Sequence, residues 1–194
     1  MTRLQKTGPE EIVYKGKIFE IVKQPMKAGD KRVVFEIARR SPGTRLLIVK
    51  NNQLLIAKEF RSELNDYDYR LPGGKVFDTL EEYNRHRTTD ILPFAVEAAK
   101  RECKEETGLV AKKIKYFATA QSGATVVWDL IYFIIDEFEE NKKGQELEVG
   151  EVVNIEWKSF KEVKKMCKEG DISEDRTLGI LFKFFLQYPK NYIN

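Results

Sequence analysis

Three glutamates and one arginine crowd into six consecutive positions, Arg101 to Glu106. Glu102, Glu105 and Glu106 stand at spacings i, i+3 and i+4, so on a helix all three carboxylates share one face. Such carboxylates repel one another unless a cation joins them, and Arg101 can neutralise part of the charge through a bidentate contact. Ligands that are all oxygen select a hard divalent ion, so the cluster predicts bound Mg²⁺, with Mn²⁺ as the alternative.

The surroundings of this cluster decide between two interpretations. A lone cluster of this kind is more often a solvated helix face. Here the cluster lies at the end of a helix predicted over 93–107, which has an apolar stripe. Gly108 follows it and suits the left-handed end of a helix. The loop Leu71-Pro72-Gly73-Gly74 precedes this helix in the sequence. These features together favour a chemical site.

These segments resemble the Nudix box. Its pattern is Gly, five residues, Glu, seven residues, Arg-Glu, an apolar residue, any residue, Glu-Glu, any residue, Gly and an apolar residue. Arg101 to Leu109 matches every specified position of the second half, and Gly74 matches the opening glycine. The resemblance implies an α+β Nudix fold, an α/β/α sandwich with a mixed sheet and a small N-terminal antiparallel sheet. It also implies metal-dependent hydrolysis of a nucleoside diphosphate linked to another moiety.

The first half of the box departs from the pattern. The arginine is expected at position 88 and stands at 101, so thirteen residues are inserted, roughly within 77–92. The position of the box's first glutamate is occupied by Pro93. Either Glu81 or Glu82 takes that glutamate's place in space, or no residue does. The polar insert is predicted to be partly helical. It is either a flap beside the substrate, with Arg85 as a substrate contact, or a tolerated surface loop.

Other segments resemble the ADP-ribose and ADP-sugar pyrophosphatase branch. They are the N-terminal sheet, the pair Phe60-Arg61 after a strand, and the stretch 169–172 before a helix. The branch implies a homodimer built with the N-terminal sheet, a nucleoside diphosphate sugar as substrate, and Arg61, Gly73 and Gly74 as substrate contacts. The stretch 121–127 lacks the proline and acidic residues common there, which weakens ADP-ribose itself as the substrate.

The resemblance also assigns roles. Arg101, Glu102, Glu105 and Glu106 would be catalytic, and the three glutamates would bind the metal together with the carbonyl of Gly74. A later loop often supplies a general base, and here it offers three glutamates. Glu151 is favoured because it opens a strand, Glu148 is second, and Glu146 is the third candidate. Two other functions stay open, a nucleotide-binding sensor with little catalysis and a pyrophosphohydrolase of RNA 5′ ends.

The elements that must position these residues can be read from apolar periodicity and turn residues. The hairpin turn Asn51-Asn52 and the capping box that begins at Ser159 are the clearest local signals. Residues 1–43 are predicted to form the N-terminal, dimerising sheet, and residues 44–194 the Nudix domain. The expected strands are 12–24, 31–40, 45–50, 53–60, 114–120, 127–136 and 152–157, the expected helices are 93–107, 159–170 and 174–188, and 61–70 is expected to be irregular.

Composition narrows the classes of protein and of partner that remain possible. The chain has 194 residues, is 42% apolar and carries a formal net charge of +3, so a packed core is expected and nucleic acid is an unlikely partner. No apolar run approaches the roughly 18 residues of a membrane helix. One histidine, His86, makes a Ser-His or Cys-His hydrolase hard to build, and two cysteines are too few for a disulfide framework. A cytoplasmic protein acting on a small molecule is predicted.

Overall fold

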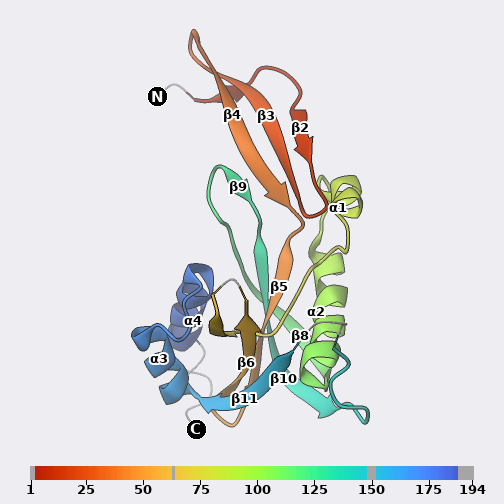
Figure 1. Cartoon of the computed structure of the whole chain (residues 1–194), viewed down its shortest axis with the longest axis vertical. Coiled ribbons are helices and arrows are strands. Elements are labelled where there is room, and N and C mark those ends of the chain that lie inside the picture. The colour runs from red at the N-terminus through yellow and green to blue at the C-terminus, as the bar shows by residue number, and fades with distance from the viewer. Residues whose placement is uncertain (1–2, 63, 148–151, 188–194) are drawn as a thin grey trace.

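The computed structural model describes residues 3–62, 64–147 and 152–187. It contains a small sheet near the N-terminus and a larger mixed sheet flanked by helices, the α+β Nudix architecture expected from the sequence. The small sheet stands away from the rest of the molecule, at the top of Figure 1. No helix in the described ranges is both long and apolar enough to cross a membrane.

The N-terminal sheet has the strand order β1-β3-β4-β9, with β2 also paired to β3. Its bounds are β1 (Gln5–Lys6), β2 (Glu11–Lys15), β3 (Phe19–Ala28), β4 (Lys31–Arg40) and β9 (Val126–Val127). The single strand predicted over 12–24 is wrong, because the chain turns at Gly16 and folds β2 back onto β3. The short strand β9 arrives from the larger sheet and runs parallel to β4 at Ala38 and Arg39.

The larger sheet has the order β11-β6-β5-β10-β8, with β7 paired to β6. The strands are β5 (Gly43–Lys50), β6 (Gln53–Arg61), β7 (Asp66–Arg70), β8 (Leu109–Ala120), β10 (Leu130–Glu140) and β11 (Val153–Ser159). The parallel pair β5–β10 makes the sheet mixed. The expectation that 61–70 is irregular is wrong, because the backbone of Asp66 to Arg70 pairs with the end of β6 even though its side chains are polar.

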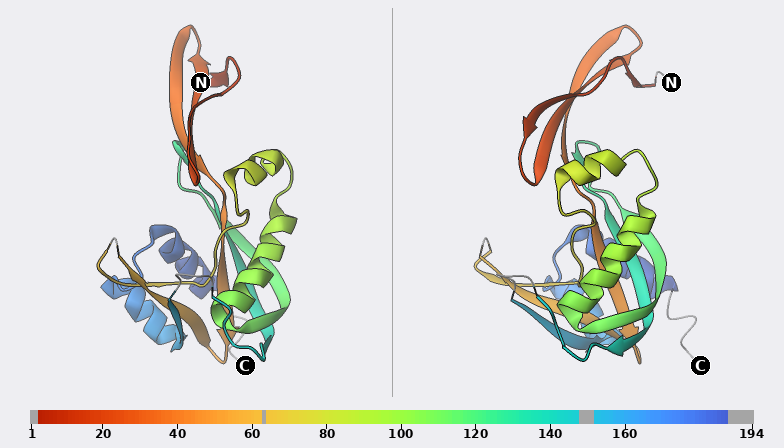
Figure 2. Two further views of the ribbon diagram at one scale, coloured as in Figure 1. Left: turned by 45° about the vertical axis from the view of Figure 1, so that its right-hand side comes forward. Right: turned by 90° about the vertical axis from the view of Figure 1, so that its right-hand side faces the viewer.

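Helices cover both faces of the larger sheet (Figure 2). They are α1 (Leu80–His86), α2 (Leu92–Thr107), α3 (Phe160–Glu169) and α4 (Asp175–Gln187). Leu46 and Ile48 of β5 pack towards α2, whereas Leu47 and Val49, on the other face of the same strand, pack towards α3 and α4. Side chains alternate along a strand, so one apolar run supplies both layers of the sandwich.

Local signals place the helix ends. Gly108 ends α2 with φ of +66° and donates its N–H to the Lys104 carbonyl at 3.0 Å, as its position after the box predicts. Ser159 caps α3 through the predicted reciprocal hydrogen bonds with Glu162. Cys103, at the apolar position of the box, is buried, and burial raises the pKa of its thiol to about 11. The thiol is therefore a neutral core group.

The inserted segment lies against the N-terminal sheet. Its helix α1 is next to the N-terminal end of α2 and the lower end of the small sheet (Figures 1 and 2). Asn84 Nδ2 donates to Glu20 Oε2 at 2.9 Å, and Arg87 Nη2 contacts Glu10 Oε1 at 2.5 Å. His86 stacks on Phe77 with ring centroids 5.8 Å apart. The insert thus links the two sheets, and its role beside the substrate stays a prediction.

Candidate active site

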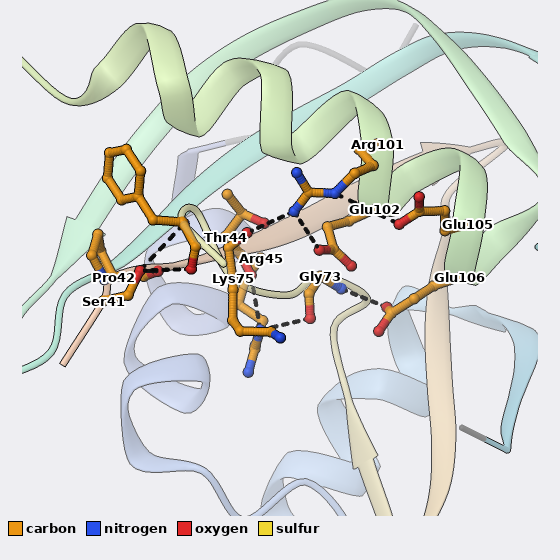
Figure 3. A network of polar contacts seen from close by, with 11 residues as sticks. Ser41, Pro42, Thr44, Arg45, Gly73, Lys75, Arg101, Glu102, Glu105 and Glu106 are labelled. Atoms are coloured by element: carbon orange, nitrogen blue, oxygen red, sulfur yellow. Dashed lines mark hydrogen bonds and ion pairs between the residues drawn. The ribbon is translucent and has the colours of Figure 1, made fainter. Parts of the chain in front are cut away.

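The cluster predicted from the sequence forms at the C-terminal half of α2 (Figure 3). Arg101 Nη2 donates to the Lys75 carbonyl at 3.0 Å and lies 3.2 Å from Glu102 Oε1. Its Nε is 3.7 Å from Glu105 Oε2. Arg101 therefore holds the loop after Gly74 against the helix and offsets the charge of two of the three glutamates.

Glu106 is joined to the same loop from the other side. Its Oε2 accepts a hydrogen bond of 2.7 Å from the Gly73 N–H (Figure 3). Gly73 has φ of +136°, a conformation that side chains rarely allow, and a Cβ there would lie 2.4 Å from the Thr44 carbonyl oxygen. The glycine is needed for the loop to present its N–H to the carboxylate.

Gly74 lies directly beside Glu102. A Cβ added at Gly74 would come within 2.4 Å of Glu102 Oε1, and the Gly74 carbonyl accepts from the Thr44 N–H at 2.8 Å. A carbonyl oxygen has two lone pairs, so this hydrogen bond leaves one for a further contact. The backbone of Gly74 therefore lies close to the Glu102 carboxylate, with no room for a side chain between them.

The two adjacent glycines give a matched test of this geometry. In Gly74→Ala the new methyl group meets the flexible end of Glu102, so we expect the carboxylate to move, activity to fall about tenfold or more, and thermal stability to change little. In Gly73→Ala the methyl group meets backbone at a positive φ, so both activity and stability should fall. Steady-state kinetics and thermal unfolding of the two variants check this. Full activity in Gly74→Ala would contradict the placement of Glu102.

The three glutamates fit a hard divalent cation by donor type. Their side chains and the Gly74 carbonyl supply only oxygen, and the space beside Glu102 exists because position 74 lacks a Cβ. Among the described residues, no three acidic, histidine or cysteine side chains already converge in the arrangement of a metal site. Instead Glu105 Oε2 lies 3.7 Å from Arg101 Nε, and Glu106 Oε2 accepts a hydrogen bond from the Gly73 N–H.

An arginine that the sequence analysis did not select lies next to this loop. Arg45 Nη1 donates to the carbonyls of Gly73 and Thr44, each at 2.8 Å (Figure 3). Burial lowers the pKa of Arg45, the charge of Arg70 lowers it further, and Glu106 and Glu174 oppose the shift. The signal for Arg45 was a cationic residue inside the apolar strand TRLLIVK. That pattern is also compatible with a side chain reaching out to solvent, so sequence alone could not select it.

The loop after β10 docks onto the end of α2. The Glu146 N–H donates to the Glu105 carbonyl at 2.9 Å, and the Glu146 carboxylate lies 2.9 Å from Lys104 Nζ. Hydrogen bonds from Lys104 and Asn141 lower the pKa of Glu146. The two favoured candidates for the general base, Glu148 and Glu151, lie outside the described residues.

The remaining predicted residues are not part of the cluster. Arg61 Nη2 forms an ion pair of 2.8 Å with Glu59, on its own strand. Glu81 and Glu82 occupy the first turn of α1 and Arg85 its last turn, on the segment that contacts the N-terminal sheet. Among the described residues, neither glutamate joins Glu102, Glu105 and Glu106 in a group that could hold a metal ion. The substrate roles of Arg61 and Arg85 stay predictions.

Comparisons with known proteins identify the family of this chain and a solved structure with a similar fold. The family model of the NUDIX domain matches residues 39–178, which is most of the chain. A comparison with curated proteins finds no match. Among solved structures, 180 chains match, and one of them is the crystal structure of an ADP compounds hydrolase. That structure has a TM-score of 0.72 and 17% sequence identity, and the alignment covers 94% of each chain, so the two share a fold.

Proposed function

The chain belongs to the Nudix family and is a Nudix pyrophosphohydrolase, and from that premise we propose that it hydrolyses the diphosphate bond of a nucleoside diphosphate sugar. The substrate would be of the ADP-ribose or ADP-sugar type. The observation that carries the proposal is the joining of Arg101, Glu102 and Glu106 to the loop Gly73-Gly74-Lys75 by the contacts described above. The solved structure of similar fold is that of a hydrolase of ADP compounds, which supports ADP derivatives as the first substrates to test.

Nudix hydrolases generally depend on divalent metal ions, and we propose Mg²⁺ or Mn²⁺ for this chain. Glu102, Glu105, Glu106 and the Gly74 carbonyl would hold the ion. When bound, such an ion neutralises the diphosphate and makes water a stronger nucleophile at neutral pH.

Side chains of the protein would bind the phosphates, accept a proton and contact the rest of the substrate. In the proposal Arg101 and Arg45, on either side of the Gly73 loop, supply positive charge for the phosphoryl oxygens. A glutamate of the loop before β11, Glu151 or Glu148, would accept the proton of the attacking water. Glu146 is a weaker candidate, because its charge is already stabilised by Lys104. Arg61 and Arg85 are proposed contacts of the nucleoside and of the sugar, respectively.

A substrate panel tests the function directly. Purified protein is incubated with Mg²⁺ and, separately, with EDTA, and the products from ADP-ribose, other nucleoside diphosphate sugars, dinucleotides and triphosphate-ended RNA are quantified. The proposal expects metal-dependent release of two monophosphate products from at least one nucleoside diphosphate sugar. Binding of these compounds without turnover would favour a nucleotide sensor. Preferred cleavage of the RNA would favour an RNA 5′-end pyrophosphohydrolase.

We also propose that residues 1–43 join two copies of the chain as a homodimer. The outer edge of β4 pairs with β9 only at Ala38 and Arg39, so most of that edge is unpaired within the described structure. The small sheet also exposes an unusual number of large apolar side chains. They are Ile12, Val13, Tyr14, Ile18, Phe19, Val33, Val34 and Phe35. A second copy would cover both the edge and these side chains.

Light scattering tests the dimer. We expect wild-type protein at micromolar concentration to have twice the chain mass of 22.6 kDa, and Val34→Glu to shift it to the single-chain mass, because a charge would be buried in the interface. Phe182→Glu is the control, since Phe182 is also a largely exposed apolar residue but lies on α4. A wild-type protein that scatters as a monomer would refute the dimer.

A further inference from the structure

Two arginines outside the Nudix box, Arg40 and Arg176, lie over one tryptophan, and the charge of a third, Arg45, acts on Arg40. Arg40 ends β4, Arg45 lies in β5, and Arg176 lies in the first turn of α4. The Trp128 ring has the guanidinium carbon of Arg40 4.2 Å from its centroid and that of Arg176 also at 4.2 Å. We refer to Arg40, Arg45, Arg176 and Trp128 as the Arg40 cluster. Its members come from four separate segments, so the fold alone assembles it.

The positive charges of this cluster are unevenly compensated. Arg176 has a carboxylate partner, because its Nε lies 2.6 Å from Glu174 Oε1. Arg45 is bound by two backbone carbonyls. Arg40 forms no ion pair with any described residue. Its neighbours are the faces of Trp128 and of Phe19, the latter at 5.2 Å, and its buried Nε has no hydrogen-bond partner. Among the described residues, Arg40 therefore has neither a carboxylate nor a carbonyl partner for its charge.

The charges and the burial around Arg40 also disfavour its protonated form. Burial lowers the pKa of Arg40, and the charges of Arg45 and Arg176 lower it further. An arginine stays protonated in spite of such shifts, so the cluster is a local concentration of positive charge. A dianion at this place would relieve the repulsion and supply the counterion that Arg40 lacks among the described residues.

We propose that the Arg40 cluster binds a phosphate of the substrate that is separate from the diphosphate being cleaved. The inference rests on the proposed function, because Arg45 connects the cluster to Gly73 and hence to the glutamates of the site. The preferred substrate is then a nucleoside diphosphate derivative with a further phosphomonoester. That group sits either on the nucleoside ribose or on the moiety at the other end of the diphosphate.

Calorimetric titration in EDTA measures this binding without turnover. The three ligands are ADP-ribose, ADP-ribose with a 2′-phosphate on its adenosine, and ADP-ribose with a phosphate on its distal ribose. We expect one of the two phosphorylated ligands to bind about tenfold to a hundredfold more tightly than ADP-ribose, the range for hydrogen bonds to charged groups. Which of the two gains affinity identifies the end of the substrate that reaches the cluster.

Variants assign the gain to the cluster. Arg40→Gln should remove most of it while leaving the affinity for ADP-ribose unchanged, and Arg40→Lys should keep part of it, since charge remains without the fork. Arg32→Gln, an exposed arginine on the same strand, should keep all of it. Equal affinity of wild-type protein for all three ligands, or a full gain in Arg40→Gln, overturns the inference. Hydrolysis in Mg²⁺ is a separate readout, so failure of the proposed function is distinguishable from failure of this one.

Discussion

Glu105→Gln and Glu106→Gln are expected to lower kcat/KM by on the order of a hundredfold or more, with the fold intact. Each change removes a charge and keeps the shape of the side chain. In Glu106→Gln the amide oxygen can still accept the hydrogen bond from the Gly73 N–H, so the loop should stay in place. The loss would therefore report on charge at the site. Steady-state kinetics in Mg²⁺ measure the loss, and thermal unfolding confirms that the fold is retained.

A control on the same helix makes this result specific. Glu97 also lies on α2, but its partner is Lys100 at 2.6 Å and both side chains are largely exposed. Glu97→Gln should therefore leave kcat/KM near the wild-type value, because exposed ion pairs contribute little. Near-normal turnover in both box variants would show that the glutamates do not carry the reaction, whatever the family resemblance.

Arg39→Met is expected to give the largest loss of stability, about 3–5 kcal/mol, because it leaves a buried carboxylate without its partner. Arg39 and Glu20 are both buried, and their charged atoms are 3.0 Å apart. Arg39 also contacts both carboxylate oxygens of Glu10, at 2.9 and 2.6 Å. Because these residues join the small sheet to the insert through Asn84 and Arg87, the loss should appear in chemical denaturation of the whole chain.

Two further variants distinguish the cost of an unpaired buried charge from the cost of losing the side chain itself. Arg39→Met combined with Glu20→Gln should recover part of the stability, since no unpaired charge then remains buried. Lys23→Met breaks an exposed pair with Glu36, 3.8 Å long, on the same sheet and should cost at most about 1 kcal/mol. If Arg39→Met is as stable as Lys23→Met, the network does not hold the insert to the sheet.

Acid should weaken the same network. The hydrogen bond from Arg39 lowers the pKa of Glu10 below its ordinary 4.5, against the opposing effect of burial. A carboxyl group with a lowered pKa stabilises the fold above its unfolded-state pKa and loses that contribution as the pH falls through the folded value. Denaturation curves of wild-type protein should therefore show a decline in stability below about pH 4.5 that is smaller in Glu10→Gln.

The structure adds two sets of contacts to what the sequence predicts for the insert. Its place within the box predicts a flap near the diphosphate or a tolerated surface loop, and both stay predictions. The insert bonds to Glu10 and Glu20 on one side and packs its aromatic residues against Phe94 of α2 on the other. The insert therefore connects the N-terminal sheet to α2, the helix that carries Glu102, Glu105 and Glu106.

The sequence alone determined the features that depend on neighbours along the chain. The helix over 93–107, its end at Gly108 and the shared face of Glu102, Glu105 and Glu106 follow from spacings of three and four residues. The cap at Ser159 follows from hydrogen bonds within one turn. Gly73 and Gly74 were selected through the resemblance to the Nudix box, which opens with a glycine.

Only the tertiary structure decided which distant residues meet. The strand break at Gly16 depends on the pairing of β2 with β3, and the polar strand β7 forms because β6 offers it an edge. Arg45 reaches Gly73 across 28 positions, and Asn84 reaches Glu20 across 64. Such contacts leave no periodic trace in the sequence, since either side chain alone is compatible with exposure to solvent. They form because the packing of two sheets and α2 removes water from both partners at once.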